Sequence, residues 1–199
     1  RSLAGSSDNP TGTSAQFRNP SGITTDGTNV YVADTGNHLI RQIVIDNGTV
    51  TTLAGTAGSS GSTDDNGTSA SFDTPYGITT DGTNLYVADS FNHLIRQIGI
   101  DNRSVTTLAG SGFGTSDGIG TLARVRRPYG ITTDGTNLYV ADTNNHLIRQ
   151  IVISTGAVTT LAGDGIGGSR NGENVTEARF KNPAGITTDG IDLYVIEKS

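Results

Sequence analysis

Short runs of alternating apolar and polar residues fill this chain, and clusters of turn-forming residues separate them. The first clear set of such runs covers residues 22–25, 30–33, 38–45 and 50–53. A period of two sends successive side chains to opposite faces of a β-strand. Asp26-Gly27, between the first two runs, is a strong hairpin signal. The pattern therefore predicts four antiparallel strands joined by tight turns.

The same set of strands recurs along the chain. The phrase Gly-Ile-Thr-Thr-Asp-Gly begins at Gly22, Gly77, Gly130 and Gly185, at spacings of 55, 53 and 55 residues. Such a period indicates units that cannot bury their apolar faces alone and must stack on their neighbours. We therefore predict one domain over residues 1–199. It holds three complete sets of four strands, called blades below, at about 22–55, 77–110 and 130–163, and a partial fourth over 185–196.

The connections between the sets repeat more loosely. Each carries an apolar residue followed within three positions by a proline; the pairs are Phe17 and Pro20, Phe72 and Pro75, Val125 and Pro128, and Phe180 and Pro183. We expect a short helical turn whose apolar residue fills the space between blades. The proline then opens the next innermost strand, where its missing N–H costs least.

Residues 22–43, with the Asn37-His38-Leu39 triplet, resemble the NHL-repeat family, and the triplet recurs in register at Asn92 and Asn145. The resemblance implies an all-β fold, a β-propeller of four-stranded antiparallel blades, commonly six in the family. Residues 1–5 match the end of a fourth strand, so we expect them to complete the blade of 185–196 and close a ring. Two alternatives are a longer parent chain and a ring shared by several chains.

Composition narrows the setting. With 33% hydrophobic residues, 16% charged residues and 28 glycines, the chain suits many short strands joined by turns. No apolar run reaches the roughly 20 residues of a membrane-spanning helix. Without Cys, the chain has neither disulfides nor thiolate zinc ligands. The low Lys content and the absence of oxidisable sulfur favour an extracellular or cell-envelope protein, as in bacteria.

Three repeated polar residues suggest metal or acid–base chemistry, but their spacing favours a structural role. Equivalent positions of successive blades lie around a ring, too far apart to share one ion at roughly 2–2.6 Å. Within a blade, the Asp can accept turn N–H bonds, the His can bond locally, and the Arg needs the Asp as its partner. These structural residues are Asp34, His38, Arg41, Asp89, His93, Arg96, Asp142, His146 and Arg149.

Cofactor and catalytic signals are weak. The acidic turns at 64–67 and 164–168 suggest calcium loops, but the first lacks the Gly and Glu of a helix–loop–helix site. We expect no cofactor, with calcium as an alternative. The glycines at 110, 112 and 114 precede no helix pattern, which argues against phosphate binding. Because the three His occupy equivalent repeat positions, no catalytic set is evident, although some propeller relatives are lyases or lactonases.

The differences between copies point to a binding surface. In a propeller, the connections between blades and the turns between the second and third strands open on one face. Basic and aromatic outliers there form a predicted ligand-binding rim: Arg18, Phe91, Phe113, Arg124, Arg126, Arg127, Arg179 and Lys181. Such a rim suits an acidic glycan, a small carboxylate ligand or an acidic protein.

The leading interpretation is a non-catalytic scaffold that binds a ligand or a protein. The net charge of −6 makes nucleic acid an unlikely partner. One alternative is a structural subunit that self-associates through open strand edges of the incomplete blade. A second alternative is an enzyme of the lyase or lactonase kind.

Overall fold

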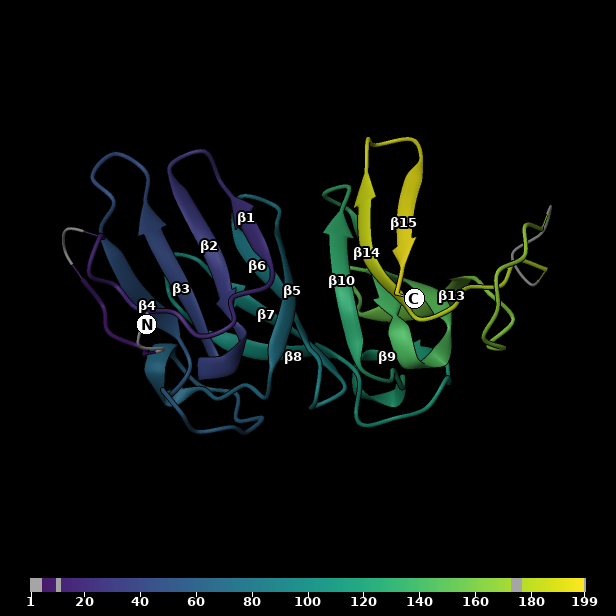
Figure 1. Ribbon diagram of the computed structural model, residues 1–199. Coiled ribbons are helices and arrows are strands. Elements are labelled where there is room, and N and C mark those ends of the chain that lie inside the picture. Colours follow the sequence, from purple (N-terminus) through teal and green to yellow (C-terminus); the bar gives the residue numbers. More distant parts are fainter. Residues whose placement is uncertain (1–4, 10–11, 173–176, 199) are drawn as a thin grey trace.

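The protein consists of antiparallel β-sheets that follow one another along an arc, as the computed structural model in Figure 1 shows. The structure describes residues 5–9, 12–172 and 177–198. Blade 1 comprises β1 (Ile23–Thr25), β2 (Asn29–Asp34), β3 (Leu39–Val44) and β4 (Val50–Ala54). Blade 2 comprises β5 (Pro75–Thr80), β6 (Asn84–Asp89), β7 (Leu94–Gly99) and β8 (Val105–Ala109).

Blade 3 has the same order but gains an outer strand. It comprises β10 (Pro128–Thr133), β11 (Asn137–Asp142), β12 (Leu147–Val152), β13 (Ala157–Ala162) and the two-residue β9 (Gly118–Ile119), which pairs with β13. A final pair, β14 (Pro183–Thr188) and β15 (Leu193–Glu197), follows it. The described residues also form four 3-10 turns: η1 (Thr35–Asn37), η2 (Gly67–Ser69), η3 (Gly120–Leu122) and η4 (Thr143–Asn145).

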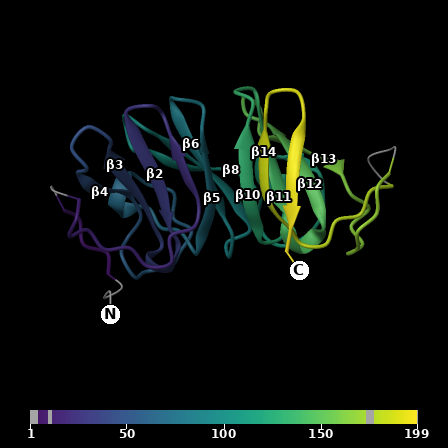
Figure 2. The same ribbon diagram turned by 45° about the horizontal axis from the view of Figure 1, so that its top comes forward.

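The first strand of each unit lies innermost, as predicted. Figure 1 shows β5 between β1 and β10, and Figures 1 and 2 both show β14 beside β10. Close approach at this axis explains a repeated glycine. A Cβ on Gly77 would collide with the carbonyl of Tyr129, and one on Gly22 would collide with the carbonyl of Tyr76. Only glycine leaves room for neighbouring blades at that distance.

Alternation along the strands builds the core between blades. In β2, Tyr31 and Ala33 are buried on the face toward blade 2, where they join one apolar cluster with Ile78 and Val87. The next blade repeats the arrangement, and Tyr86 packs in a cluster with Ile131 and Val140 of blade 3. Phe72 and Val125, predicted to fill the gaps between blades, are fully buried.

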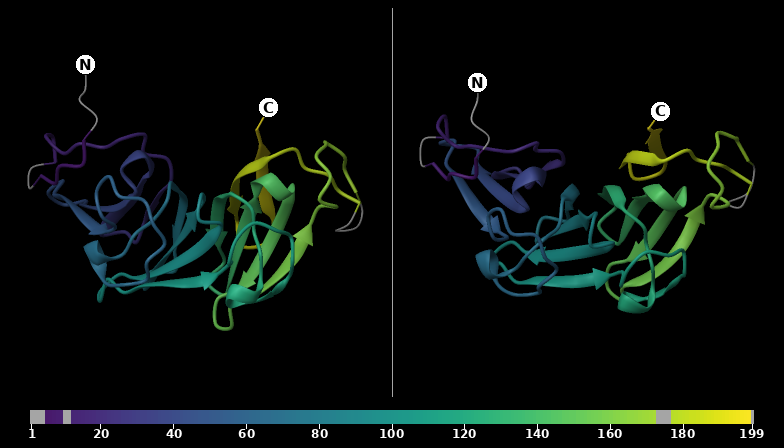
Figure 3. Two further views of the ribbon diagram at one scale, coloured as in Figure 1. Left: turned by 90° about the horizontal axis from the view of Figure 1, so that it is seen from below. Right: turned by 60° about the horizontal axis from the view of Figure 1, so that its bottom comes forward.

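The ends of the arc stand apart (Figure 3). Among the described residues, the β14–β15 pair has no third or fourth strand. The predicted ring closure depends on residues 1–4, which lie outside the described residues. Gly5 is described, and its carbonyl accepts a hydrogen bond from the Asn37 side chain of blade 1. Blade count and ring closure therefore stay predictions.

One local prediction was wrong. The third strand was expected to begin at His38, but β3 begins at Leu39 and His38 adopts a left-handed backbone with φ of 60° after η1. His93 and His146 have the same conformation, at 60° and 59°. The preceding 3-10 turn ends there, and the left-handed residue redirects the chain into the strand.

Candidate functional site

Buried arginines anchor the connections between blades. Arg96 is fully buried, and its guanidinium lies 2.9 Å from a carboxylate oxygen of Asp89 and 2.6 Å from one of Asp64. It also donates to the backbone carbonyls of Thr63 and Ser71. Arg41 and Arg149 make the matching contacts with Asp34 and Asp142 at 3.1 Å. The predicted Arg–Asp pairing is confirmed, and the arginine also ties the connection to its blade.

The same aspartates fix the chain where it enters the next inner strand. Asp142 accepts the backbone N–H of Arg126 at 2.7 Å on one carboxylate oxygen, and the Asn145 side chain at 2.8 Å on the other. Burial raises the pKa of Asp142 to about 6, against the lowering effect of these hydrogen bonds and of Arg149. The ion pair with Arg149 and these hydrogen bonds together let the carboxylate hold the connection.

The repeated histidines were predicted to form hydrogen bonds within their own blade, but they accept hydrogen bonds across the junction between blades. The Nδ1 atom of His93 accepts the backbone N–H of Arg127 at 3.0 Å, and that of His38 accepts the N–H of Thr74 at the same distance. The residues that donate have left-handed backbones, with φ of 50° for Arg127 and 55° for Thr74. Each histidine therefore fixes the residue that opens the following blade.

Side chains at these fixed positions differ between junctions. The residue bonded to the buried aspartate is Asp73 between blades 1 and 2, and Arg126 between blades 2 and 3. The next residue is Thr74 at the first junction and Arg127 at the second. One backbone frame thus presents an acidic side chain at the first junction and two cations at the second.

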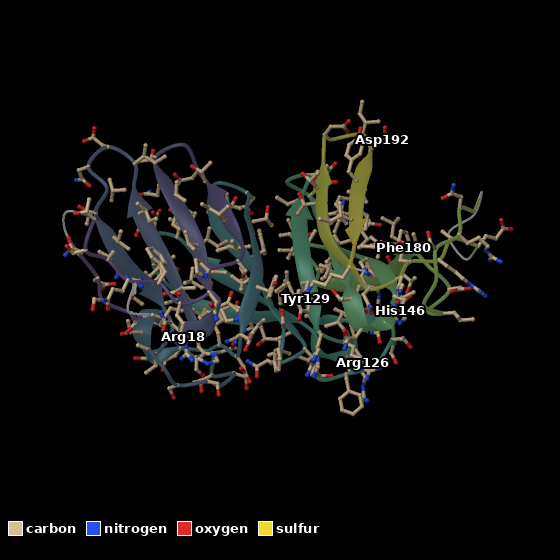
Figure 4. All side chains as sticks on the ribbon, viewed as in Figure 1. Arg18, Arg126, Tyr129, His146, Phe180 and Asp192 are labelled. Carbon is tan, nitrogen blue, oxygen red and sulfur yellow. The ribbon has the colours of Figure 1, made fainter. Side chains whose placement is uncertain are left out.

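A cup of about 370 Å³ lies at the second junction, lined by His93, Phe113, Arg126, Arg127 and Asn144. His93 follows the β6–β7 turn, Phe113 comes from the connection after β8, and Asn144 belongs to η4. The Arg127 guanidinium stacks 4.3 Å from the ring centre of Phe91. Figure 4 places Arg126 and Arg18 at the same end of the blades, opposite the Asp192 turn.

The electrostatics of this cup favour an anion. Burial lowers the pKa of His93 below its usual 6.5, and the positive charges of Arg127 and Arg126 lower it further. Neutral His93 accepts a hydrogen bond at Nδ1, so its proton resides on Nε2. Phe113 meets the imidazole edge-on, with ring centres 6.0 Å apart. The cup therefore combines cationic groups, a neutral N–H donor and an aromatic wall.

The remaining predicted rim residues do not line the cup. Arg179 forms an ion pair with Asp164 at 2.6 Å, which engages its charge. Arg124 packs its side chain near Gly114 and does not line the cup. Arg18 lies beside Gly36 on blade 1, and Lys181 is exposed before β14. Of the predicted rim residues, Phe113, Arg126 and Arg127 line the cup, and the Phe91 ring stacks against the Arg127 guanidinium.

Two residues that line the cup were not among the rim residues predicted from the sequence. His93 was assigned a structural role only, and Asn144 was not singled out. A signal for Asn144 existed, because Gly36, Phe91 and Asn144 occupy the same place in three otherwise similar turns. Its backbone N–H donates to the carbonyl of Arg126, which brings the turn against the cationic residues.

The acidic turns proposed as calcium loops have protein partners. Asp64 pairs with Arg96 and accepts the Thr107 hydroxyl at 3.1 Å, while Asp164 pairs with Arg179. Within the described ranges, no three His, Asp or Glu side chains gather as metal ligands. No helix among these residues is long and apolar enough to cross a membrane.

Sequence comparisons place the repeats. The sequence model of the NHL repeat matches residues 17–43. Human NHL repeat-containing protein 2 is 31% identical over 198 residues, covering 86% of this chain and 27% of the relative. The chain belongs to the NHL-repeat family. Protein SUPPRESSOR OF QUENCHING 1, chloroplastic, from Arabidopsis thaliana, is 34% identical over 169 residues, covering 78% of this chain and 16% of that relative. The chain thus spans about a quarter or less of these two relatives.

Solved structures similar to this NHL protein support the β-propeller fold. An auxiliary nutrient binding protein from Bacteroides thetaiotaomicron aligns with a TM-score of 0.71 at 21% identity, over 91% of this chain and 45% of that one. A virginiamycin B lyase from Staphylococcus aureus aligns at 0.57 and 17% identity, over 89% of this chain and 48% of that one. At such identities the likeness shows the fold alone, and binding proteins and enzymes share it.

Proposed function

We propose that this protein is a non-catalytic binding scaffold that captures an anionic ligand in the cup between blades 2 and 3. The observation that carries the proposal is the pair Arg126 and Arg127, which replaces the Asp73 and Thr74 of the preceding junction on the same backbone frame. The ligand class that fits best is a carboxylate with an apolar or aromatic portion, such as an acidic side chain of a protein or an acidic glycan.

The geometry supports a carboxylate because the cup offers several donors of different kinds. Guanidinium groups bind carboxylates through paired N–H groups. The N–H on Nε2 of His93 adds a neutral donor, and the edge-on ring of Phe113 supplies apolar area. Stacking on Phe91 restrains Arg127 before a ligand arrives, which reduces the entropy cost of binding.

The same residues argue for binding rather than catalysis. His93 commits Nδ1 to a backbone N–H, and no carboxylate lines the cup as a general base or nucleophile. The propeller fold also occurs in a nutrient-binding protein of a bacterium, which favours an extracellular or envelope setting for this chain.

The test uses benzoate, which joins a carboxylate to an aromatic ring, and follows the three histidine ring signals by NMR. Benzoate should shift the His93 signals in a saturable way and leave those of His38 unchanged. The double variant Arg126→Asp with Arg127→Thr installs the residues of the first junction. It should weaken binding by about a hundredfold, because charge-assisted hydrogen bonds are lost from two cations.

Arg124→Ser is the matched control, since it removes a cation from the same connection outside the cup. It should bind benzoate as the parent chain does. The double variant should also keep its unfolding midpoint, because Asp73 and Thr74 already occupy this backbone in blade 2. Equal responses of His93 and His38, or equal loss in both variants, would contradict an anion site in this cup.

A further inference from the structure

The two cations of the cup, Arg126 and Arg127, pair with no carboxylate among the described residues. Carboxylates are not scarce in the chain, whose net charge is −6. Other arginines of the blades and connections each lie within 3.1 Å of an aspartate oxygen; these are Arg41, Arg96, Arg149 and Arg179. The cup therefore stands out by having cations whose charge the protein leaves unbalanced.

Both positive charges act on the same small space. Arg126 and Arg127 line one cup, and the charge of each lowers the pKa of His93, which lines it with them. Phe113 and Asn144, the other lining residues, carry no charge. Within the described residues, the wall of the cup thus holds two positive charges and no negative one. A ligand with two negative charges would balance them.

Each guanidinium is left with its N–H groups free to bind. Arg127 is restrained by stacking 4.3 Å from the ring centre of Phe91, and Arg126 is held through its backbone N–H, which donates to Asp142 at 2.7 Å. In the part of the chain that the structure describes, no residue accepts a hydrogen bond from either guanidinium. One guanidinium binds one carboxylate through paired N–H groups. The two arginines can therefore bind two carboxylates.

We propose that the ligand of the cup is a small dicarboxylate, with one carboxylate on each guanidinium. This inference rests on the anion binding proposed above and narrows it to ligands with two negative charges. The cup of about 370 Å³ has the size of a small-molecule site, roughly 300–1,000 Å³, which favours a free small molecule over a protein partner. The ring of Phe113 suits an apolar or aromatic portion between the two carboxylates.

The test compares isophthalate, a benzene ring with two carboxylates, with its monoamide. The monoamide has nearly the same shape and one negative charge fewer, so the comparison isolates the second charge. Binding is followed by the NMR signals of the His93 ring, as for benzoate. Isophthalate should bind at least about tenfold more tightly than the monoamide, because a second charge-assisted pair forms. The monoamide should bind about as tightly as benzoate.

Single variants show whether each arginine holds one carboxylate. Arg126→Ser and Arg127→Ser should each lower the affinity for isophthalate roughly tenfold and remove its advantage over the monoamide. Arg124→Ser is the matched control, because it removes a cation of the same connection that does not line the cup. It should keep the full advantage of isophthalate. Loss of the advantage in Arg124→Ser as well would mean that net charge, and not the cup, selects the ligand.

The outcomes separate this inference from the proposed function. If benzoate shifts the His93 signals but isophthalate binds no more tightly than its monoamide, the dicarboxylate inference is wrong and the anion site remains. If none of the three compounds shifts these signals in a saturable way, the anion site itself is wrong. A blocked peptide with two glutamates that binds more tightly than isophthalate would overturn the choice of a small molecule and indicate a protein partner.

Discussion

The junction between blades 1 and 2 and the junction between blades 2 and 3 share one backbone and differ in charge. At both, a histidine Nδ1 accepts a backbone N–H at 3.0 Å and a buried aspartate accepts another at 2.7 Å. The first junction carries Asp73, 3.5 Å from His38, and the second carries Arg126 and Arg127. Two consecutive residues therefore set the chemistry of a junction, while the repeated residues fix its shape.

The largest change in stability should come from disrupting the buried Arg–Asp contacts that the junctions have in common. Arg149→Met leaves the fully buried Asp142 without its cation and frees the connection that carries Arg126. An uncompensated buried charge costs about 3–5 kcal/mol of unfolding free energy. Urea unfolding should show this loss, whereas Arg124→Ser should change stability by less than about 0.5 kcal/mol. Equal stability of the two variants would mean that the Arg149–Asp142 ion pair does not stabilise the fold.

Transferring the cations to the first junction sharpens the comparison. Asp73→Arg with Thr74→Arg places guanidiniums beside His38, at a position whose counterpart, Arg127, has the same left-handed backbone. Benzoate should then shift the His38 signals, with affinity there raised about tenfold by new charge-assisted hydrogen bonds. No response at His38 would show that the two arginines need the remaining cup residues in order to bind an anion.

The aromatic wall should contribute less than the cations. Phe113→Ala removes the ring that meets His93 edge-on and leaves the arginines in place. Aromatic contacts of this kind contribute about 0.5–1.5 kcal/mol, so benzoate affinity should fall roughly threefold. Acetate lacks the ring and should bind the variant and the parent equally. A matching loss for acetate would indicate that Phe113 acts through the shape of the cup.

The smallest effect should come from pH. Because the folded protein lowers the pKa of His93 below the unfolded value of about 6.5, the contribution of neutral His93 is fully present above that value. It is lost as pH falls through the folded pKa, because the unfolded chain binds the proton first. Thermal unfolding of the parent should therefore lose more stability between pH 7.5 and 5 than His93→Gln does. Parallel pH profiles would contradict this assignment.

A similar balance governs the Asp-Gly turns. Burial opposes ionisation of Asp26 and of Asp134, but hydrogen bonds from turn N–H groups and from a tyrosine hydroxyl prevail and lower each pKa to about 2. These turns should therefore stabilise the fold above about pH 3.8 and lose this contribution as pH falls toward 2. The loss would lie below the pH window of His93, so the two effects can be separated.

Much of the fold could be predicted because the sequence pattern of each strand recurs in several copies of the repeat. Alternation in 30–33 gave the strand that the structure extends to Asn29–Asp34, and the Asp34–Arg41 pair followed from burial of an arginine beside one acidic neighbour. The left-handed His38 did not follow, since a strand pattern runs through it. The short β9 has no sequence signal, because two residues carry no alternation.

The candidate site was harder to predict because it forms between blades. Variation between copies pointed to Arg126 and Arg127, but the same criterion selected Arg179, whose charge is engaged by Asp164. His93 is repeated in every complete blade and so gave no signal of a special role. Its neighbours make it distinctive, and two of them, Arg126 and Arg127, lie more than 30 residues away along the chain.

The buried arginines carry a consequence for how such a protein can change. Each one grips its connection at two separated points, as Arg96 does at the carbonyls of Thr63 and Ser71. The chain outside these grips is free to differ in length, and the stretch from Gly55 to Asp64 is longer than that from Gly110 to Asp117. One connection can therefore be replaced by another of different length and sequence without a change in the blades that hold it. A new binding surface can arise in this way at one junction while the other junctions keep their own surfaces.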